Sequence, residues 1–287
     1  MKNNILVLTL ILNSSVLFSQ TKFNPTQPNE GPGSSVYLHE KVIQHDFAQS
    51  PDGFWLYEPS SPRPDSANVV VFNHGYGGYN PMIYGQWIKH LVRKGNIVIF
   101  PRYQKNVYSP KPSKFSTNVS QAIRDALKKM KNNNFIKPKI KNLAMVGHSY
   151  GGVITADLAI NYEKHNIPKP IAILLCSPGS GPFNGGILDN YKTMASDIKM
   201  VIMVAENDRI VGEKFGEKVF KTATNVIQRN YIRQLHDNST TPPHRAGHNE
   251  SYALDMDFDN GVRNATTRRS LRKAITNNVD YYGYPQS

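Results

Sequence analysis

The sequence has a single cysteine, Cys176, among its 287 residues. One cysteine cannot form a disulfide within the chain or supply a cysteine-based zinc cluster, so small cross-linked folds of either kind are excluded. Acidic residues are also scarce, 21 against 34 lysines and arginines, and the net charge is +13. The basic residues are dispersed and form no block of five or more. We therefore interpret the surplus as a soluble basic surface and expect no nucleic-acid partner.

Long hydrophobic runs are missing as well. The apolar run at residues 5–12 follows Lys2 and is too short to cross a bilayer. Ser19 is a small residue that suits a signal-peptidase cut. We therefore expect a signal peptide at 1–19, a secreted or periplasmic protein and no membrane span, with an uncleaved anchor as the alternative. Residues 20–35, rich in Pro, Gly, Asn and Ser, predict a flexible N-terminal arm.

The remaining length, residues 36–287, fits one large α/β domain with a sizeable core. Apolar runs and helical spacing alternate along it. Strands are expected at Lys41–Phe47, 53–57, 69–72, 96–100, 143–146, 171–175, 200–205 and 231–235, and helices at 80–94, 116–131, 151–164, 212–222 and 266–279. Strands that alternate with helices imply right-handed crossovers, and so a mostly parallel central sheet with helices on both faces.

The segment at 143–152 reads Leu-Ala-Met-Val-Gly-His-Ser-Tyr-Gly-Gly. It predicts a buried strand, then Gly-x-Ser-x-Gly, then a helix. In that context Ser149 stands on a strained strand-to-helix turn, and the flanking glycines allow the helix and the backbone to approach closely. The pentapeptide alone is a weak signal, but the strand before it and the helix after it favour a nucleophile over a plain turn.

A glycine-rich loop follows the earlier strand, in the segment Asn-His-Gly-Tyr-Gly-Gly at 73–78. Acyl transfer needs two N–H donors aimed at the developing oxyanion. We expect the N–H of Tyr150, next after the nucleophile, and the N–H of Tyr76 in this loop, with His74 as a structural support. A phosphate cradle is the alternative, but the loop lacks both the Lys-Ser/Thr ending and the Gly-x-Gly-x-x-Gly spacing.

These motifs resemble the α/β-hydrolase family, in particular esterases and lipases similar to bacterial cutinase-like and polyester hydrolases. The family's order of nucleophile, acid and histidine places the acid after a later strand. The stretch Glu206-Asn-Asp-Arg-Ile210 is similar to the acid loop of those enzymes. The resemblance implies that Asp208 is the triad acid, with Glu206 as the competitor.

Three histidines follow the last expected strand: His236, His244 and His248. The segment 237–248 is similar to a family pattern that starts with Asp, contains one or two prolines and ends in Ala-x-His. On that resemblance we choose His248, and His244 and His236 remain the alternatives.

The resemblance implies a serine hydrolase that cleaves carboxylic esters through an acyl-enzyme and needs no cofactor. Its substrate would be a small-molecule, lipid or polymer ester. The loop at 176–179 has no Trp, and Tyr150 stands where the polyester hydrolases often have Met, so we assign the chain to esterases and lipases at large. A peptidase or amidase on the same triad, or a non-catalytic binding protein that kept the fold, are the alternatives. The oligomeric state is not readable.

An acidic stretch near the C-terminus, with Asp255, Asp257 and Asp259, looks like the start of a calcium loop. It lacks Gly at the sixth place, and Thr266 stands where a closing Glu belongs. We therefore expect a solvated loop here and no metal in the site.

Overall fold

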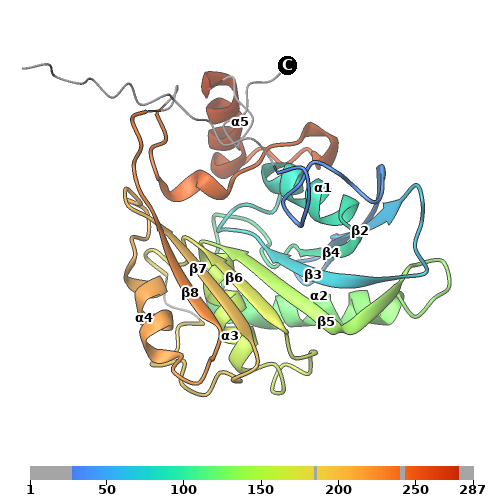
Figure 1. The fold of residues 1–287 in the computed structure, drawn as a ribbon, viewed down its shortest axis with the longest axis horizontal. Helices are drawn as coiled ribbons and strands as arrows, with labels where there is room; N and C mark the ends of the chain where they lie inside the picture. The colour runs from blue at the N-terminus through green and yellow to red at the C-terminus, as the bar shows by residue number, and fades with distance from the viewer. Residues whose placement is uncertain (1–27, 184–185, 240–242, 278–287) are drawn as a thin grey trace, which may run out of the picture.

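Eight strands form one sheet in the order β1-β2-β4-β3-β5-β6-β7-β8 (Figure 1). A computed structural model describes residues 28–183, 186–239 and 243–277. The strands are β1 Lys41–Phe47, β2 Phe54–Ser60, β3 Ser66–Asn73, β4 Asn96–Pro101, β5 Lys137–His148, β6 Ala172–Cys176, β7 Lys199–Ala205 and β8 Arg229–Gln234. The two pairings of β2 are antiparallel and all others are parallel, which confirms the mostly parallel sheet.

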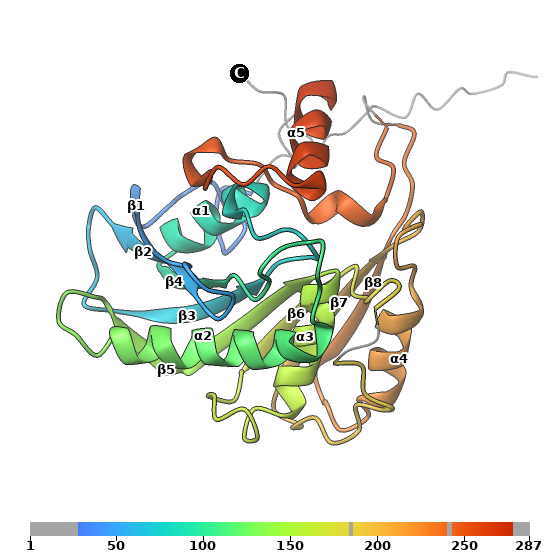
Figure 2. The ribbon, with the colours of Figure 1, turned by 180° about the vertical axis from the view of Figure 1, so that it is seen from behind.

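Helices connect most of the parallel strands, as the alternation predicts, but no helix lies between β6 and β7 among the described residues. The α-helices are α1 Gly85–Arg93, α2 Phe115–Lys129, α3 Tyr150–Ile160, α4 Lys214–Thr222 and α5 Ala265–Asn277. Short 3-10 turns are η1 Pro81–Tyr84, η2 Pro112–Lys114, η3 His248–Ser251 and η4 Met256–Phe258. Figure 2 shows α2 and α3 lying across one face of the sheet. No described helix is long and apolar enough to cross a membrane.

The two faces of the sheet carry separate hydrophobic cores. Successive residues of a strand point to opposite faces, so β3 divides its apolar side chains between them. Val69 and Val71 pack in the core that contains α2 and α3, whereas Val70 and Phe72 pack in the core that contains Ile88 of α1. Residues 69–72 form a continuous apolar run because β3 is covered on both faces.

Two elements differ most from the prediction, although other bounds also shift, such as those of the helix expected at 151–164, which ends at Ile160. The strand expected at 143–146 begins six residues earlier, because Lys137–Lys139 of β5 pair with Ser66–Asn68 of β3. These residues are mostly exposed and carry lysines, so hydrophobicity gave no sign of them. The single helix expected at 80–94 is a 3-10 turn followed by α1. Pro81 starts the turn and the side chain of Asn80 accepts the N–H of Met82, which caps its first residues.

The first and the last described segments pack onto this frame. The predicted signal peptide at 1–19 lies outside the described residues, as do residues 20–27 of the predicted arm. The described part of the arm lies against the end of α1, where Lys94 Nζ donates to Ser34 Oγ at 2.6 Å and to Val36 O at 2.6 Å. After β8 the chain passes over the edge of the sheet at which that strand ends and reaches α5 (Figure 1). This last segment brings a histidine to the other site residues.

Candidate active site

Ser149 joins the end of β5 to the start of α3. Its backbone has φ 56° and ψ −122°, a conformation that a non-glycine residue adopts only when its surroundings enforce it. Its N–H donates to Cys176 O at 2.9 Å, and its own C=O accepts the N–H of Gly179 at 3.1 Å. The turn is therefore tied to the end of β6, and the serine stands at the N-terminus of α3.

Glycines let the turn pack this closely. A Cβ on Gly147 would lie 2.3 Å from Gly151 O, and one on Gly151 would lie 2.0 Å from Asn73 O. The first distance is set by the strand-to-helix reversal itself. The second is set by β3, whose end runs directly beside the start of α3. Real Cβ atoms do not reach such distances, so both positions of the Gly-x-Ser-x-Gly motif require glycine.

Gly151→Ala is expected to reduce the stability of the protein severely. The added methyl would overlap the backbone oxygens of Asn73, the last residue of the central strand β3, and of His74, the residue after it. We expect a loss of about 3 kcal/mol or more in the free energy of unfolding, or no soluble protein. Thermal unfolding measures it. Gly33→Ala is the control, because its Cβ would meet its nearest neighbour at 3.8 Å. Equal stability of the two variants would contradict the close approach.

The side chain of Ser149 forms a continuous hydrogen-bonded chain with two residues far along the sequence. Ser149 Oγ lies 2.9 Å from His248 Nε2, and His248 Nδ1 lies 2.8 Å from Asp208 Oδ2. All three residues are buried. The structure thus brings together the serine, acid and histidine that the sequence analysis selected.

Electrostatics fixes the direction of these hydrogen bonds. Burial opposes ionisation of Asp208, but hydrogen bonds from His248 and from the N–H groups of Val211 and Ile210 hold the pKa of this carboxyl below its ordinary value. A carboxylate can only accept, so Nδ1 of His248 carries the proton. Nε2 is then the ring nitrogen left to accept the proton of Ser149 Oγ, which is the arrangement that a general base needs.

The competing residues have other contacts. Glu206 accepts the N–H of His236 at 2.8 Å and lies 3.4 Å from Arg233, so it braces the loop after β7. His236 is exposed and contacts Asn238 at 2.8 Å. Nδ1 of His244 lies 3.8 Å from the carboxylate of Glu250.

The glycine-rich loop after β3 passes directly over Ser149: a Cβ on Gly75 would lie 3.2 Å from Ser149 Cβ. Three amides of this loop have protein acceptors. Gly75 N–H donates to Tyr84 Oη at 2.9 Å, Gly77 N–H to Gln104 Oε1 at 2.7 Å, and Gly78 N–H to Gly75 O at 2.8 Å. The N–H of Tyr76 donates to no acceptor among the described residues. The loop therefore leaves available the donor that the sequence analysis selected.

Two further groups hold this loop. The ring of His74 is buried and stacks on Tyr103 with 4.1 Å between centroids, and Nε2 lies 2.9 Å from Arg102 O. From the C-terminal segment, Asn264 Nδ2 donates to Gly77 O at 2.7 Å and Thr266 Oγ1 to Tyr76 O at 3.3 Å.

The acidic stretch expected to be a solvated loop is instead docked on η1. The N–H of Asp255 donates to Met82 O at 3.0 Å, and Lys89 Nζ lies 3.0 Å from Asp255 and 3.2 Å from Asp257. Asp259 pairs with Arg263. Lysine and arginine therefore contact the carboxylates that a calcium loop would direct to the ion. No group of three or more potential ligands suited to a metal occurs among the described residues.

An aromatic cluster lies beside the Ser149 turn. The ring of Tyr76 packs on Phe183 at 4.6 Å between centroids, and Tyr150 packs on Phe183 at 6.3 Å and on Phe115 at 5.2 Å. The sequence analysis placed Tyr76 and Tyr150 here but missed Phe183, which follows β6 in a stretch with no clear periodicity.

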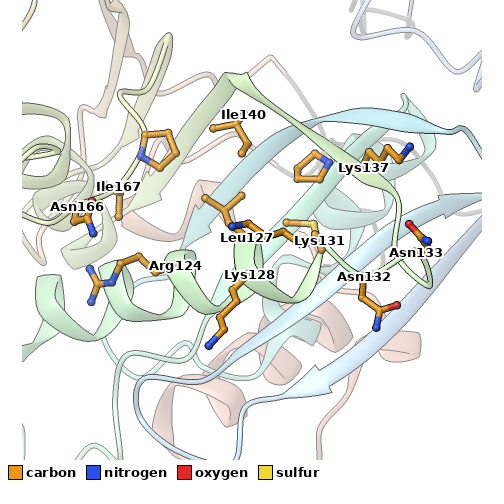
Figure 3. Close-up of a pocket in the computed structure, with 13 residues that line it drawn as sticks. Arg124, Leu127, Lys128, Lys131, Asn132, Asn133, Lys137, Ile140, Asn166 and Ile167 are labelled. Carbon is orange, nitrogen blue, oxygen red and sulfur yellow. The ribbon is translucent and has the colours of Figure 1, made fainter.

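A surface hollow of about 790 Å³ lies at the end of the sheet opposite to Ser149 (Figure 3). Its lining includes Arg124 and Lys128 of α2, Lys131 just after that helix, and Lys137 from the start of β5. Ser149 comes after the last residue of β5, whereas the hollow lies at the first. The hollow is therefore separate from the catalytic edge and is not an acyl pocket.

The free energy of unfolding is expected to fall as the pH drops below neutrality. Burial lowers the pKa of His148 to about 3 and that of His74 to about 4, against 6.5 for a free histidine. Between those values the unfolded chain binds protons that the folded protein does not, so stability rises with pH across this window and is lost on acidification. The loss between pH 7 and pH 4 is on the order of several kcal/mol.

Urea unfolding at pH 7 and pH 5 measures this loss. His148→Gln removes one of the two groups, so the variant should lose less stability than the unchanged protein over the same interval. A pH dependence as steep as that of the unchanged protein would show that His148 is not a buried neutral group.

A mostly parallel sheet whose central strand ends in a serine on a strained turn, followed directly by a helix, defines an α/β-hydrolase. Comparison with solved structures agrees: the chain is similar to a structure from a study of two fungal esterases of Rhizomucor miehei, with a TM-score of 0.55, 15% identity and 84% of each chain covered. At that identity the similarity concerns the fold. Comparison with curated proteins finds no match.

The chain belongs to the chlorophyllase family, because the model of that family matches residues 37–204, more than half of its length. It is accordingly a carboxylic-ester hydrolase. The matched region contains Ser149 and the loop with Tyr76 but ends before Asp208 and His248. The choice of acid and base therefore rests on the geometry and on the sequence pattern, not on the family match.

Proposed function

We propose that the protein is an exported serine hydrolase that cleaves carboxylic esters with Ser149 as nucleophile, His248 as base and Asp208 as acid. The observation that carries the proposal is the buried chain from Ser149 Oγ through His248 to Asp208, with distances of 2.9 and 2.8 Å. Each donor and acceptor in it points in the direction that proton transfer from the serine requires.

The reaction follows from these positions. His248 Nε2 takes the proton of Ser149 as Oγ attacks the ester carbonyl, and the N–H groups of Tyr76 and Tyr150 stabilise the tetrahedral oxyanion. Asp208 stabilises the imidazolium that forms. The proton passes to the leaving alcohol, which departs and leaves Ser149 acylated. Water activated by His248 then releases the acid and restores the serine.

Export rests on the N-terminal sequence: a single lysine, a short apolar run and the small residue Ser19 support a cleaved signal peptide at 1–19 and a secreted or periplasmic location. The substrate is an ester of a small molecule, a lipid or a polymer. The rings of Tyr76, Phe183 and Tyr150 support an apolar group next to the scissile bond.

A series of p-nitrophenyl esters of increasing chain length tests the proposal, together with labelling by a fluorophosphonate. We expect hydrolysis of at least the short esters and one equivalent of label on Ser149, located by mass spectrometry. Chlorophyll, after which the family is named, is a further substrate to offer. Ester hydrolysis without labelling of Ser149 would show that another group performs the reaction.

A further inference from the structure

His148, the residue before the nucleophile, has no part in the triad, yet its ring is buried between three site segments. Its Nε2 lies 2.9 Å from the backbone carbonyl oxygen of His248. Its Nδ1 lies 2.9 Å from Tyr84 Oη, which in turn accepts the N–H of Gly75 at 2.9 Å. One ring thus links the serine turn to the loop of the base and, through a tyrosine, to the oxyanion loop.

The direction of each hydrogen bond is determined. A carbonyl oxygen only accepts, so Nε2 of His148 carries a proton. Burial and the neighbouring His248 lower the pKa of His148 to about 3, so the ring is neutral and Nδ1 has a lone pair. The hydroxyl of Tyr84 must then donate to Nδ1, and its oxygen is left to accept the N–H of Gly75. Only one assignment of donors and acceptors satisfies all three hydrogen bonds, which favours a fixed geometry of the two side chains.

The loop of the base needs such support. It begins after β8, and on the side of the acid Asn207 holds it: Asn207 N–H donates to Ala246 O at 2.9 Å and Asn207 Nδ2 to Arg245 O at 3.0 Å. His148 holds the opposite side through the carbonyl of His248 itself. The backbone of the base is thus held between the acid loop and the serine turn.

The charge state of His148 also matters for the reaction. The rings of His148 and His248 are 4.9 Å apart. When His248 takes the proton of the serine, a second cation at that distance in a buried site would oppose it. A neutral ring can stay beside the imidazolium and still anchor its backbone.

We propose that His148 and Tyr84 are positioning residues, which hold the imidazole of His248 and the oxyanion loop at Gly75–Tyr76 in place relative to Ser149. The proposal rests on the proposed function of the Ser149–His248–Asp208 triad. Neither residue touches the reacting atoms. Their effect is expected in the transition state, where the base and the oxyanion donors must be correctly placed, and not in the binding of the ester.

The first test is Tyr84→Phe, which removes one oxygen and releases the N–H of Gly75. We expect kcat on a p-nitrophenyl ester to fall about ten-fold or more, with KM nearly unchanged. Tyr57→Phe is the matched control. Tyr57 is buried in the same core, and its hydroxyl has no hydrogen-bond partner among the described residues, so kcat should not change.

The second test compares His148→Gln with His148→Phe. The amide nitrogen of glutamine reaches about as far as Nε2 and can still donate to His248 O, whereas phenylalanine cannot. We expect the glutamine variant to keep clearly more kcat than the phenylalanine variant at equal KM. We also expect Tyr84→Phe to cost little more when added to His148→Phe, because both changes break one hydrogen-bonded chain.

The outcomes separate the two proposals. If Ser149→Ala is inactive while folded Tyr84→Phe and both His148 variants keep the kcat of the unchanged protein, the positioning role is wrong and the triad stands. A change in KM alone, or additive losses in the double variant, would also overturn it. If Ser149→Ala keeps its activity, the triad itself is wrong. If His148→Phe fails to fold, the kcat values of Tyr84→Phe and His148→Gln still test the positioning role.

Discussion

Ser149→Ala is expected to fold normally and to lose about 10⁴-fold or more in kcat on any ester that the protein hydrolyses. The change removes one oxygen, and the backbone bonds of the turn, from Ser149 N to Cys176 O and from Gly179 N to Ser149 O, are unaffected. Alanine must adopt the same positive φ, and the same close packing around the turn enforces it. Ester hydrolysis at saturating substrate and the thermal midpoint measure the two expectations.

The matched control is Ser120→Ala. Ser120 is a buried serine of α2 whose hydroxyl donates to Thr117 O within its own helix, so its loss should leave kcat unchanged. Fluorophosphonate should label the Ser120 variant and not the Ser149 variant. Retention of most esterase activity by Ser149→Ala would reject the nucleophile, whatever the geometry of the turn.

Site residues could be predicted from the sequence where a reactive side chain stands in a local pattern that also predicts the secondary structure around it. Ser149 lies between an apolar segment typical of a strand and a segment with the periodicity of a helix. The glycines around it are required, because a Cβ on Gly151 would lie 2.0 Å from Asn73 O and one on Gly147 would lie 2.3 Å from Gly151 O. Asp208 lies in the loop that follows β7, after Glu206 and Asn207. Parallel strands end at the same edge of the sheet, so residues that follow different strands can meet there. The serine turn was therefore predictable from the chain alone, whereas Asp208 was chosen over Glu206 by resemblance to the acid loop of known hydrolases.

The rest depends on tertiary contacts that leave no local trace. The first part of β5 carries exposed lysines and becomes a strand only because β3 pairs with it. Tyr84 lies in a 3-10 turn that the sequence presented as part of one helix, and nothing local indicates that its hydroxyl meets His148, 64 residues away. The docking of Asp255 on η1 likewise depends on backbone groups of a distant segment.

The histidine was selected by resemblance, and its test has the second large effect. His248→Ala is expected to reduce kcat by about 10⁴-fold or more, because Ser149 Oγ then has no base at 2.9 Å to take its proton. His236→Ala and His244→Ala should keep at least about a tenth of the activity, because each removes a contact of the loop and no proton acceptor of the serine. Steady-state hydrolysis of one ester by the three variants at equal enzyme concentration makes the comparison.

The relative activities of the three histidine variants identify the base, and chemical rescue of His248→Ala is a further test. If the loss in His248→Ala is the loss of a base and not of the fold, added imidazole should restore part of its activity and should leave Ser149→Ala inactive. A silent His244→Ala beside an active His248→Ala would show that the loop pattern selected the wrong histidine. The serine and the acid would survive that result, because Ser149 is identified by the strained turn after β5 and Asp208 by its place after β7. An inactive His248→Ala that melts far below the unchanged protein would instead show that the side chain of His248 is needed for the fold, because the backbone carbonyl that contacts His148 is still present in the variant.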